Sequence, residues 1–532
     1  MPRSQAAEDG AVGSAAAKGP VTSPAPASRG GERWRLVALA VCAAGAALVC
    51  WIVLQVPGEV FNNGDGGLKA LLARQIARGR FAVTLDLHAE PWVRELWTRG
   101  HYPFEPPFVY ATPSGPISQF PFLFPALSAP FYAVFGFRGF YVVPVLSLFA
   151  LWLVFVRAAR HAGVPGWAVA TALAALVLSS PLTLYGAMYY GHTLAVLVLF
   201  WGTVTVALPG ERSRAALLAA GALAGLAPWL RSEAWCMAGG LCLLAAVRAV
   251  RERRLAWTWF PAGVAVAVGG NLACNRLLYG RWLGLHGEQI FGYLSLRQQL
   301  LRGAHHLGVT LRELGAFYPL TLVVIAAVVA LVVARRPIPA GAGELALLAL
   351  FDLATTPFLL LSADSLDWGP RYFLVLMPLL ALMLALLLPA LAAVTRWRVA
   401  MACVLGVALL AGARKNGVEG SRMLLVNYRE RVWPALVEVR RWPSRVVVTN
   451  HQYGSMELES LLDEKAFLLV DDPRELAEVA RVLAARGESP FLFLVYPFRP
   501  LPPRFGWGPP DARGHCTARG ERGQFVLYDC TG

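Results

Sequence analysis

The chain has 532 residues, of which 57% are hydrophobic and 15% are charged, and its mean hydropathy is +0.52. Soluble domains carry about 25% charged residues, so this composition excludes an ordinary soluble protein and predicts one that crosses a membrane several times. The net charge of +15 does not indicate nucleic-acid binding, because the basic residues lie mostly in short clusters between apolar runs and no zinc-finger spacing is present.

The N-terminal part divides into a polar tail and a first apolar run. Residues 1–32 are rich in Ala, Gly, Ser and Pro, which predicts a disordered cytoplasmic tail. The run at 36–56 is long enough to span a bilayer and too long for a signal-peptide core. Further apolar runs bring the prediction to about eleven transmembrane helices. The predicted spans are 36–56, 140–156, 167–184, 193–208, 215–230, 234–247, 256–274, 317–333, 344–361, 373–388 and 399–411.

Basic residues in the short loops predict the orientation. With the N-terminus inside, five loops place their arginines inside, as the positive-inside rule requires. These loops carry Arg157/Arg160, Arg212/Arg214, Arg248/Arg251/Arg253/Arg254, Arg335/Arg336 and Arg396/Arg398. Arg414 and Lys415 are the exception, because this orientation places them outside. The outer loop 57–135 then ends in an apolar segment, 120–135, whose three prolines predict an interfacial or re-entrant element instead of a span.

An acidic residue, Asp65, lies on a glycine-rich turn at the start of this outer loop, and a helix is predicted directly after it. One face of that helix is apolar and its other faces are basic, which predicts a helix lying in the headgroup plane with its leucines toward the acyl chains. The apolar residues are Leu68, Leu71, Leu72 and Ile76; the basic ones are Lys69, Arg74, Arg78 and Arg80. Two interpretations of Asp65 remain open: a helix N-cap, which the local pattern favours, and a catalytic carboxylate.

Residues 412–532 are soluble in character and predict a small extracytoplasmic α/β domain. Strands are predicted at 445–450, 466–470, 490–496 and 524–528, and helices at 426–441 and 473–486. Asp472 is placed to cap the second of these helices. Cys516 and Cys530 are expected to form a disulfide if this region is extracytoplasmic; the sequence leaves that pairing open.

Five motifs, in their order along the chain, resemble the polytopic membrane glycosyltransferases of the GT-C fold, which include the aminoarabinose transferases and the protein O-mannosyltransferases. They are GDGGLK (64–69), FEPPF (104–108), the segment FP…APFYAVFG (120–136), GLAPWLRSEA (225–234) and GPRYFL (369–374). The resemblance covers residues 36–388 and implies a GT-C-like transmembrane domain over 33–411. It implies transfer of a hexosyl or pentosyl group from a polyprenyl-phosphate donor to an extracytoplasmic lipid, glycan or protein acceptor.

The resemblance also implies roles for individual residues. Asp65 becomes the general base that removes the acceptor's proton while the sugar leaves the polyprenyl phosphate. The departing phosphate requires cations that are already in position, and the candidates are Lys69, Arg231 and Arg371.

Each of these cations also has a structural interpretation. Lys69 is equally suited to reaching lipid headgroups. Arg231 is as readily explained by an ion pair with Glu233, and Arg371 by an ion pair with Asp364 or Asp367.

Supporting roles are less defined. Glu105, Glu233 and His192 are candidate supporting residues, although Glu105 is more often an ordinary loop residue and His192 is expected near a membrane interface. Many relatives carry a second acid beside the first, whereas Gly66 follows Asp65 here. A second acid is available from Glu59, Asp86, Glu90, Glu95 or Glu105, and the choice stays open.

Cofactors and alternative functions complete the predictions. No cofactor is certain, and a divalent metal is left open. His286, Glu288, His305 and His306 match no strong metal motif and predict a solvated loop. The alternatives to an enzyme are a transporter or flippase of lipid-linked glycans, which the near absence of ionisable residues within the spans disfavours, and a non-catalytic envelope assembly protein. The composition suggests a bacterial inner membrane.

Overall fold

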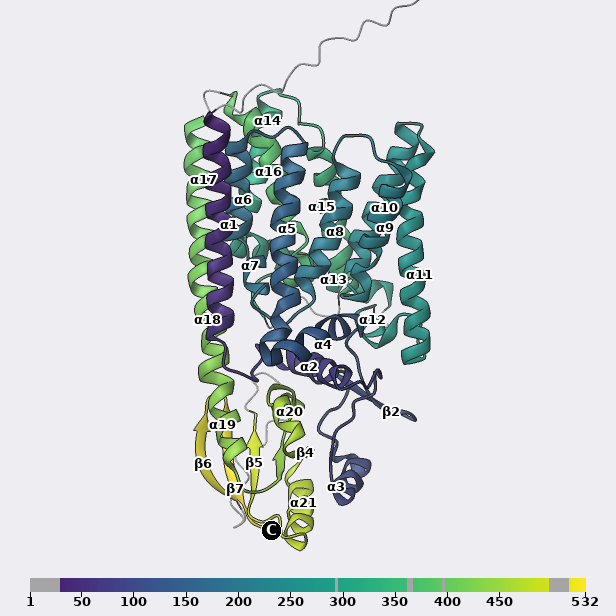
Figure 1. The fold of residues 1–532 in the computed structure, drawn as a ribbon, viewed down its shortest axis with the longest axis vertical. Helices are drawn as coiled ribbons and strands as arrows, with labels where there is room; N and C mark the ends of the chain where they lie inside the picture. The colour runs from purple at the N-terminus through teal and green to yellow at the C-terminus, as the bar shows by residue number, and fades with distance from the viewer. Residues whose placement is uncertain (1–28, 292–294, 361–366, 395–397, 497–515) are drawn as a thin grey trace, which may run out of the picture.

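The computed structural model describes residues 29–291, 295–360, 367–394, 398–496 and 516–532, and it has a helical bundle with a β-sheet at one end (Figure 1). The predicted disordered tail lies almost entirely outside the described residues. The bundle helices are α1 (Arg29–Gln55), α5 (Val142–His161), α6 (Gly166–Leu178), α7 (Leu182–Tyr185), α8 (His192–Ala207), α9 (Arg214–Gly225), α10 (Ala234–Arg251), α11 (Trp259–Tyr279), α13 (Leu296–Phe317), α14 (Leu320–Val333), α15 (Ala342–Leu359), α16 (Leu376–Ala392) and α17 (Arg398–Gly412).

Every predicted span overlaps one of these helices. By length and composition, five helices of the described ranges could each cross a membrane, or six if the bent pair α13 and α14 forms one span. Four shorter apolar helices also lie in the bundle. The chain is therefore an integral membrane protein, whereas the count of eleven crossings stays a prediction. Helix α16 is apolar on all sides and buried along most of its length, as a central helix must be.

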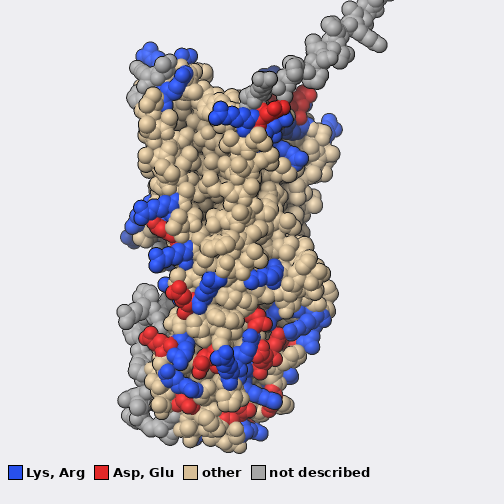
Figure 2. Space-filling view, turned by 60° about the vertical axis from the view of Figure 1, so that its left-hand side comes forward, with Lys and Arg blue, Asp and Glu red and all other residues tan. Residues whose placement is uncertain are grey.

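Charged side chains are unevenly distributed over the surface. Figure 2 shows a wide band with few charges between the basic residues at the end where α1 begins and the mixed charges over the C-terminal sheet. Such a band is what a bilayer requires, because charged groups are costly in hydrocarbon.

Two helices, α2 (Gly64–Ala77) and α4 (Leu123–Phe135), lie across the sheet end of the bundle and pack against each other (Figure 1). Helix α4 corresponds to the predicted interfacial or re-entrant segment, and η2 (Gly136–Tyr141) connects it to α5. Its position relative to the membrane surface stays a prediction.

The prediction that the leucines of α2 face the acyl chains is wrong. Nearly all of α2 is buried, and its leucines pack within the main core instead of facing lipid. Its basic residues pair with acids: Arg74 with the buried Glu459, and Arg78 with Asp463 at 2.6 Å. Each acid lies 385 positions further along the chain than the arginine it pairs with. The local pattern could therefore not reveal that protein covers both sides of the helix.

The outer loop contains short elements that the sequence did not predict. They are α3 (Pro91–Leu96), η1 (Trp97–His101) and the hairpin of β1 (Val109–Thr112) and β2 (Gly115–Ser118). A further short helix that was not predicted, α12 (Gly284–Phe291), lies between α11 and α13.

The C-terminal region begins inside a continuous helix. Helix α17 leads through η7 (Ala413–Gly420), α18 (Ser421–Val426) and η8 (Asn427–Val432) into α19 (Trp433–Arg441), so the predicted domain boundary at 412 falls within helix. The division into domains therefore stays a prediction.

A five-stranded sheet follows, in the order β4-β3-β5-β7-β6. Its strands are β3 (Val446–Thr449), β4 (Ala466–Leu469), β5 (Phe491–Val495), β6 (Cys516–Arg522) and β7 (Phe525–Cys530). Strand β3 runs parallel to β4 and β5, and β7 runs antiparallel to β5 and β6. The four predicted strands are confirmed. Strand β6 was missed because it is a largely exposed edge strand of charged and small residues.

Two local predictions for this region are also confirmed. Asp472 caps α21 (Pro473–Ala485) by accepting hydrogen bonds from the backbone N–H groups of Arg474 and Glu475. Cys516 and Cys530 form a disulfide that links β6 to β7.

The sheet is buried on both faces. Val447, Leu492 and Leu527 point into the core that they share with the helical bundle. Val448 and Phe493, which point the other way, pack beneath α21 and α3. This alternation follows from the two-residue period of a strand, and it fixes the sheet firmly to the end of the bundle.

Candidate active site

Asp65 lies in the first turn of α2, and its carboxylate is not the helix cap. Asn63 is the N-cap, because its side-chain oxygen accepts a hydrogen bond of 3.3 Å from the backbone N–H of Gly66. The capping interpretation of Asp65 is therefore wrong. With Asn63 in that role, the carboxylate of Asp65 is left to face the cavity beside α2.

The glycines of this turn are required by a close approach of the C-terminal region. Helix α20 (Gln452–Glu457) packs directly on the turn. A Cβ on Gly64 would lie 2.8 Å from the Cβ of Met456, and a Cβ on Gly67 would overlap the carbonyl oxygen of Met456. Only glycine allows two backbones to approach this closely.

A cavity of about 560 Å³ lies between the end of the bundle and the sheet. We call the side formed by Asp65, Arg231, Arg371 and Tyr372 the motif wall. The C-terminal wall is formed by Arg431, Tyr453, Glu457, Tyr496 and Gln524. The remaining lining residues are Asn62, Asn63, Gly64, Phe108, Gln119, Phe120, His286, Gln289, Ile290, Leu360, Asn427 and Val432.

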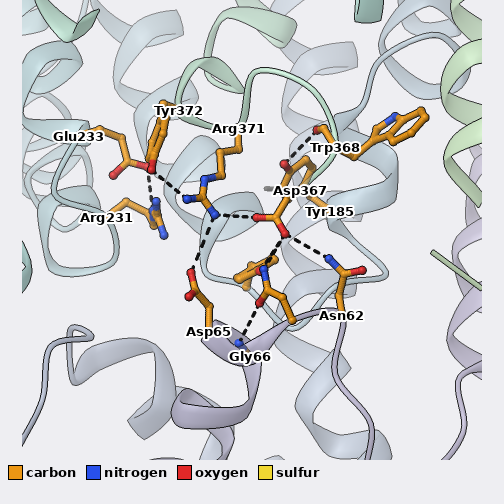
Figure 3. Close-up of polar contacts among 12 residues, drawn as sticks. Asn62, Asp65, Gly66, Tyr185, Arg231, Glu233, Asp367, Trp368, Arg371 and Tyr372 are labelled. Atoms are coloured by element: carbon orange, nitrogen blue, oxygen red, sulfur yellow. Dashed lines mark hydrogen bonds and ion pairs between the residues drawn. The ribbon is translucent and has the colours of Figure 1, made fainter. Parts of the chain in front are cut away.

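Arg371 connects Asp65 to a buried acid, Asp367 (Figure 3). Its Nη1 atom lies 2.7 Å from Oδ2 of Asp367 and 3.9 Å from Oδ2 of Asp65. The expected ion pair with Asp367 is thus confirmed, and Arg371 still lines the cavity. Asp364, the other expected partner, lies outside the described residues.

Asp367 is held from the side of the glycine-rich turn as well. Its Oδ1 accepts hydrogen bonds from Asn63 at 2.6 Å, from Asn62 at 3.2 Å and from the hydroxyl of Tyr190 at 3.2 Å. Since Asn63 also caps α2, one residue ties the turn of Asp65 to the segment that carries Arg371.

The segment that carries Arg371 is further braced through Trp368. The Nε1 atom of Trp368 donates to Asn416 at 2.9 Å, and its carbonyl accepts from the Tyr185 hydroxyl at 3.0 Å. These two hydrogen bonds, one from the side chain of Trp368 and one to its carbonyl, hold the segment that carries Arg371 in place before any ligand binds.

Arg231 and Glu233 form a buried ion pair of 2.7 Å, which confirms the expected local pair. Arg231 lines the cavity, whereas Glu233 lines a smaller adjoining pocket of about 30 Å³. Tyr372 lies between the two arginines: its ring centroid is 5.9 Å from the Cζ of Arg231 and 4.9 Å from that of Arg371.

Lys69 does not reach lipid headgroups, because its side chain is buried. Its Nζ atom lies 4.3 Å from the ring centroid of Phe120 and 4.5 Å from that of Tyr190, and it has no hydrogen-bond partner within the described ranges. Burial lowers the pKa of this amine to about 7; Asp65 opposes the shift. Snorkelling is therefore excluded for Lys69, and its amine is a buried cation held mainly by aromatic rings.

The two other candidate supporting residues lie away from the cavity lining. His192 is buried at the start of α8 and lines the smaller pocket with Glu233, while its place near a membrane interface stays a prediction. Glu105 lies beside Gln452, the first residue of α20, and its backbone N–H donates to Gln452 Oε1 at 3.1 Å.

His286 was predicted to lie in a solvated loop, and this prediction is wrong. It is buried, lines the cavity, and its Nδ1 lies 2.7 Å from the hydroxyl of Ser232. Burial lowers its pKa well below the usual value, with Arg231 adding to the shift, so the ring is neutral at pH 7. Ser232, which contacts His286, lies in the motif GLAPWLRSEA. That motif was the one sequence signal near His286 in the fold.

The structure adds to the site the whole C-terminal wall, which no sequence motif marked. Arg231 and Arg371 line the cavity together with Asp65, and the buried Lys69 lies close enough to interact electrostatically with all three. No group of three potential metal ligands occurs within the described part of the chain. Chemically, the motif wall offers a carboxylate that can accept a proton and cations that can bind an anion.

Comparison with solved structures identifies the fold. ArnT from Cupriavidus metallidurans bound to undecaprenyl phosphate matches with a TM-score of 0.52 and 12% identity over 93% of this chain and 98% of that chain. The oligosaccharyltransferase of Archaeoglobus fulgidus, in complex with Zn and sulfate, has a TM-score of 0.48 and 12% identity, with coverage of 86% and 67%. The mycobacterial arabinofuranosyltransferase AftD has a TM-score of 0.41 and 16% identity, with coverage of 92% and 41%.

No protein-family model and no curated protein sequence matches the chain. The match to ArnT nevertheless spans nearly all of both chains. The chain thus has the GT-C fold of ArnT, as its motifs predicted.

Proposed function

We propose that the protein is a membrane glycosyltransferase that moves a hexosyl or pentosyl group from a polyprenyl-phosphate donor to an extracytoplasmic acceptor. The observation that carries this proposal is a single cavity in which Asp65 faces Arg371 and Arg231, with Lys69 behind Phe120. Support also comes from the shared fold, since the ArnT structure holds undecaprenyl phosphate.

In the proposed reaction, a hydroxyl oxygen of the acceptor attacks the anomeric carbon of the donor. Asp65 accepts the hydroxyl proton as the new C–O bond forms and the bond to the phosphate oxygen breaks. The electron pair of the broken bond stays on the polyprenyl phosphate, which gains one negative charge. Arg371, Arg231 and Lys69 stabilise that charge, and because they are already fixed in the folded chain they need no reorganisation during the step.

The proposed orientation places the N-terminus in the cytoplasm and the C-terminal region outside it. The disulfide between Cys516 and Cys530 supports this, because such bonds persist in oxidising compartments. We assign the protein to a bacterial inner membrane on its composition.

A transporter or flippase of lipid-linked glycans is the rival function. Asp352, buried in α15 beside Thr356, is an ionisable residue within a predicted span, and it lines the smaller pocket. The remaining charges around that pocket belong to the motif wall and to Glu233 at the sheet end of the bundle. This arrangement favours an enzyme over a transport path, because charge is concentrated at one end and not along the bundle.

The decisive experiment is the Asp65→Asn variant, purified in nanodiscs and assayed for sugar release from polyprenyl-phosphate donors. We expect turnover to fall by about 10²–10⁴-fold, because the amide cannot take the proton, while the melting temperature stays unchanged. Asp86→Asn is the matched control, since Asp86 lies in the same loop, pairs with Arg80 and does not line the cavity. Normal turnover in Asp65→Asn refutes the catalytic assignment, and movement of intact donor across the bilayer by that variant establishes the rival.

A further inference from the structure

The C-terminal wall takes no part in the proposed transfer step, yet it directly adjoins the proposed base. Met456 lies against Gly64 and Gly67, on either side of Asp65, and α20 places Tyr453 one turn before Met456 and Glu457 directly after it. Both residues line the cavity together with Asp65. A molecule in the cavity that touches Asp65 therefore meets this wall.

Aromatic rings form much of the C-terminal wall. The ring centroid of Tyr453 lies 5.4 Å from that of Phe108 and 5.8 Å from that of Tyr496, and Tyr496 lies 5.4 Å from Phe525. A sugar ring presents C–H groups on its flat faces, and these pack well on aromatic rings. The tyrosine hydroxyls add hydrogen-bonding groups at the edge of the same surface.

The rest of the cavity lining is rich in amide side chains. They are Asn62, Asn63, Gln119, Gln289, Asn427 and Gln524. An amide both donates and accepts hydrogen bonds, which matches the neighbouring hydroxyls of a sugar. The carbonyl oxygens of Gln119 and Asn427 are buried without a hydrogen-bond partner among the residues described.

Few aliphatic side chains line the cavity, which favours a sugar over an acyl chain or an apolar peptide as its ligand. Among the described residues, the aliphatic side chains of the lining are those of Ile290, Leu360 and Val432. An acyl chain or an apolar peptide would instead require a predominantly aliphatic surface.

Glu457 contributes a polar group at the centre of this wall. Its Oε1 accepts a hydrogen bond of 3.3 Å from the hydroxyl of Tyr496, and its Oε2 accepts one from Nε2 of Gln524. Burial raises the pKa of Glu457 to about 8, while these two hydrogen bonds act in the opposite direction. At neutral pH the side chain is mostly protonated, so it can donate a hydrogen bond as well as accept one.

We infer that Tyr453, Glu457 and Tyr496 bind the sugar ring of a carbohydrate acceptor and hold one of its hydroxyls next to Asp65. The inference rests on the proposed glycosyl transfer for the role of the bound sugar, and it narrows the acceptor to a glycan or the sugar part of a glycolipid. Tyr453 supplies the stacking surface. Glu457 and Tyr496 bind the hydroxyls that point away from the base.

The test measures binding and needs no knowledge of the donor. Saturation-transfer difference NMR on the full chain in nanodiscs would use methyl pyranosides, methyl furanosides and, as a protein-like probe, a serine-containing tripeptide. We expect ring protons of at least one glycoside to be saturated by the wild type. The signal should fall about fivefold in Tyr453→Ala, the loss expected for one aromatic contact worth roughly 1 kcal/mol.

Two variants control for misfolding. Glu457→Gln keeps the size of the side chain, and its expected effect is a glycoside affinity weakened by about fivefold with an unchanged melting temperature. Tyr110→Ala removes a tyrosine from the β1–β2 hairpin, outside the cavity lining, and should leave glycoside binding unchanged. If no glycoside binds, if Tyr453→Ala and Tyr110→Ala behave alike, or if the tripeptide alone binds, the inference is overturned.

Failure of the inference can be told from failure of the proposed function. Asp65→Asn should bind glycosides as the wild type does, because the aromatic rings and Glu457 remain in place. If that variant also transfers sugar normally, the catalytic assignment fails while the sugar site stands. If it is inactive and no glycoside binds, the enzyme stands and its acceptor is not a carbohydrate.

Discussion

The motif wall and the C-terminal wall enclose the same cavity, but they differ in how their residues are marked in the sequence. Asp65, Arg231 and Arg371 each lie in a short motif, and each motif could be found without knowing the fold. Tyr453 and Glu457 lie on a six-residue helix with no distinguishing pattern. The residues proposed to act on the reacting atoms are recognisable locally, whereas the residues proposed to bind the acceptor are defined by what they pack against.

The two walls should also respond differently to substitution, and the motif wall should be the more sensitive. Arg371→Gln leaves the buried Asp367 without its cation, and loss of one partner of a buried pair costs about 3–5 kcal/mol. We expect a strongly lowered melting temperature together with loss of polyprenyl-phosphate binding, measured by thermal unfolding with and without the lipid.

The double variant Arg371→Gln/Asp367→Asn separates the two effects. Removing both charges should restore much of the stability but not the lipid binding. If lipid binding returns with stability, Arg371 is a structural residue only.

Gly67→Ala tests whether the C-terminal wall determines the position of Asp65. The new Cβ overlaps the carbonyl oxygen of Met456, so α20 and the glycine-rich turn must separate. Overpacking of this kind costs about 1–3 kcal/mol, and we expect turnover to fall more than donor affinity.

Gly58→Ala is the control for that substitution, because a Cβ at residue 58 meets no atom within 4 Å. Thermal unfolding and steady-state kinetics of both variants provide the measurement. Equal behaviour of the two variants would show that the walls are independent.

The pH dependence of donor binding gives the smallest expected effect and, compared between wild type and Lys69→Arg, reports on Lys69. Burial lowers the pKa of its amine to about 7 in the empty site, and Asp65, Arg231, Arg371 and Asp367 are the charges that act on it. An anionic donor favours the protonated amine. Affinity should therefore be greatest below pH 7 and should weaken above it, by up to about tenfold per pH unit.

Lys69→Arg supplies the comparison, because a guanidinium stays charged over this range. A sugar phosphodiester donor does not titrate near neutrality and neutral His286 adds no change, whereas Glu457 of the same cavity, with a pKa of about 8, titrates in both proteins. The difference between wild type and Lys69→Arg between pH 6.5 and 9 therefore gives the contribution of the lysine. A wild-type affinity as flat as that of the variant would contradict a contact between Lys69 and the phosphate.

Elements whose pattern is complete within a few residues could be predicted from the sequence. Four strands of the sheet and the Asp472 cap follow from local alternation and capping chemistry, and the apolar runs located the bundle helices except α13, which falls between two predicted spans. The environment of helix α2 could not be predicted in this way, because the acids that pair with its basic residues, Glu459 and Asp463, are remote in sequence.

The candidate active site shows the same difference between features with a local sequence pattern and features that depend on remote contacts. Position along the chain and motif order identified Asp65, Arg231 and Arg371, and the structure brings all three to one cavity. The assignment of Asn63 as the helix cap could not be predicted, because Asp65 fits a capping pattern equally well. His286 was misassigned because its burial depends on the segments that surround it.

The contact between the glycine-rich turn and α20 has a consequence for how the protein is made. Residues 62–67 leave the ribosome nearly 400 residues before residues 452–457, which pack on them, and Gln524 follows later still. The cavity therefore cannot be complete until residues 452–457 and Gln524 have been made and the strands that carry its C-terminal wall have joined the sheet. A chain that stopped before these residues would have the motif wall without the wall that faces it.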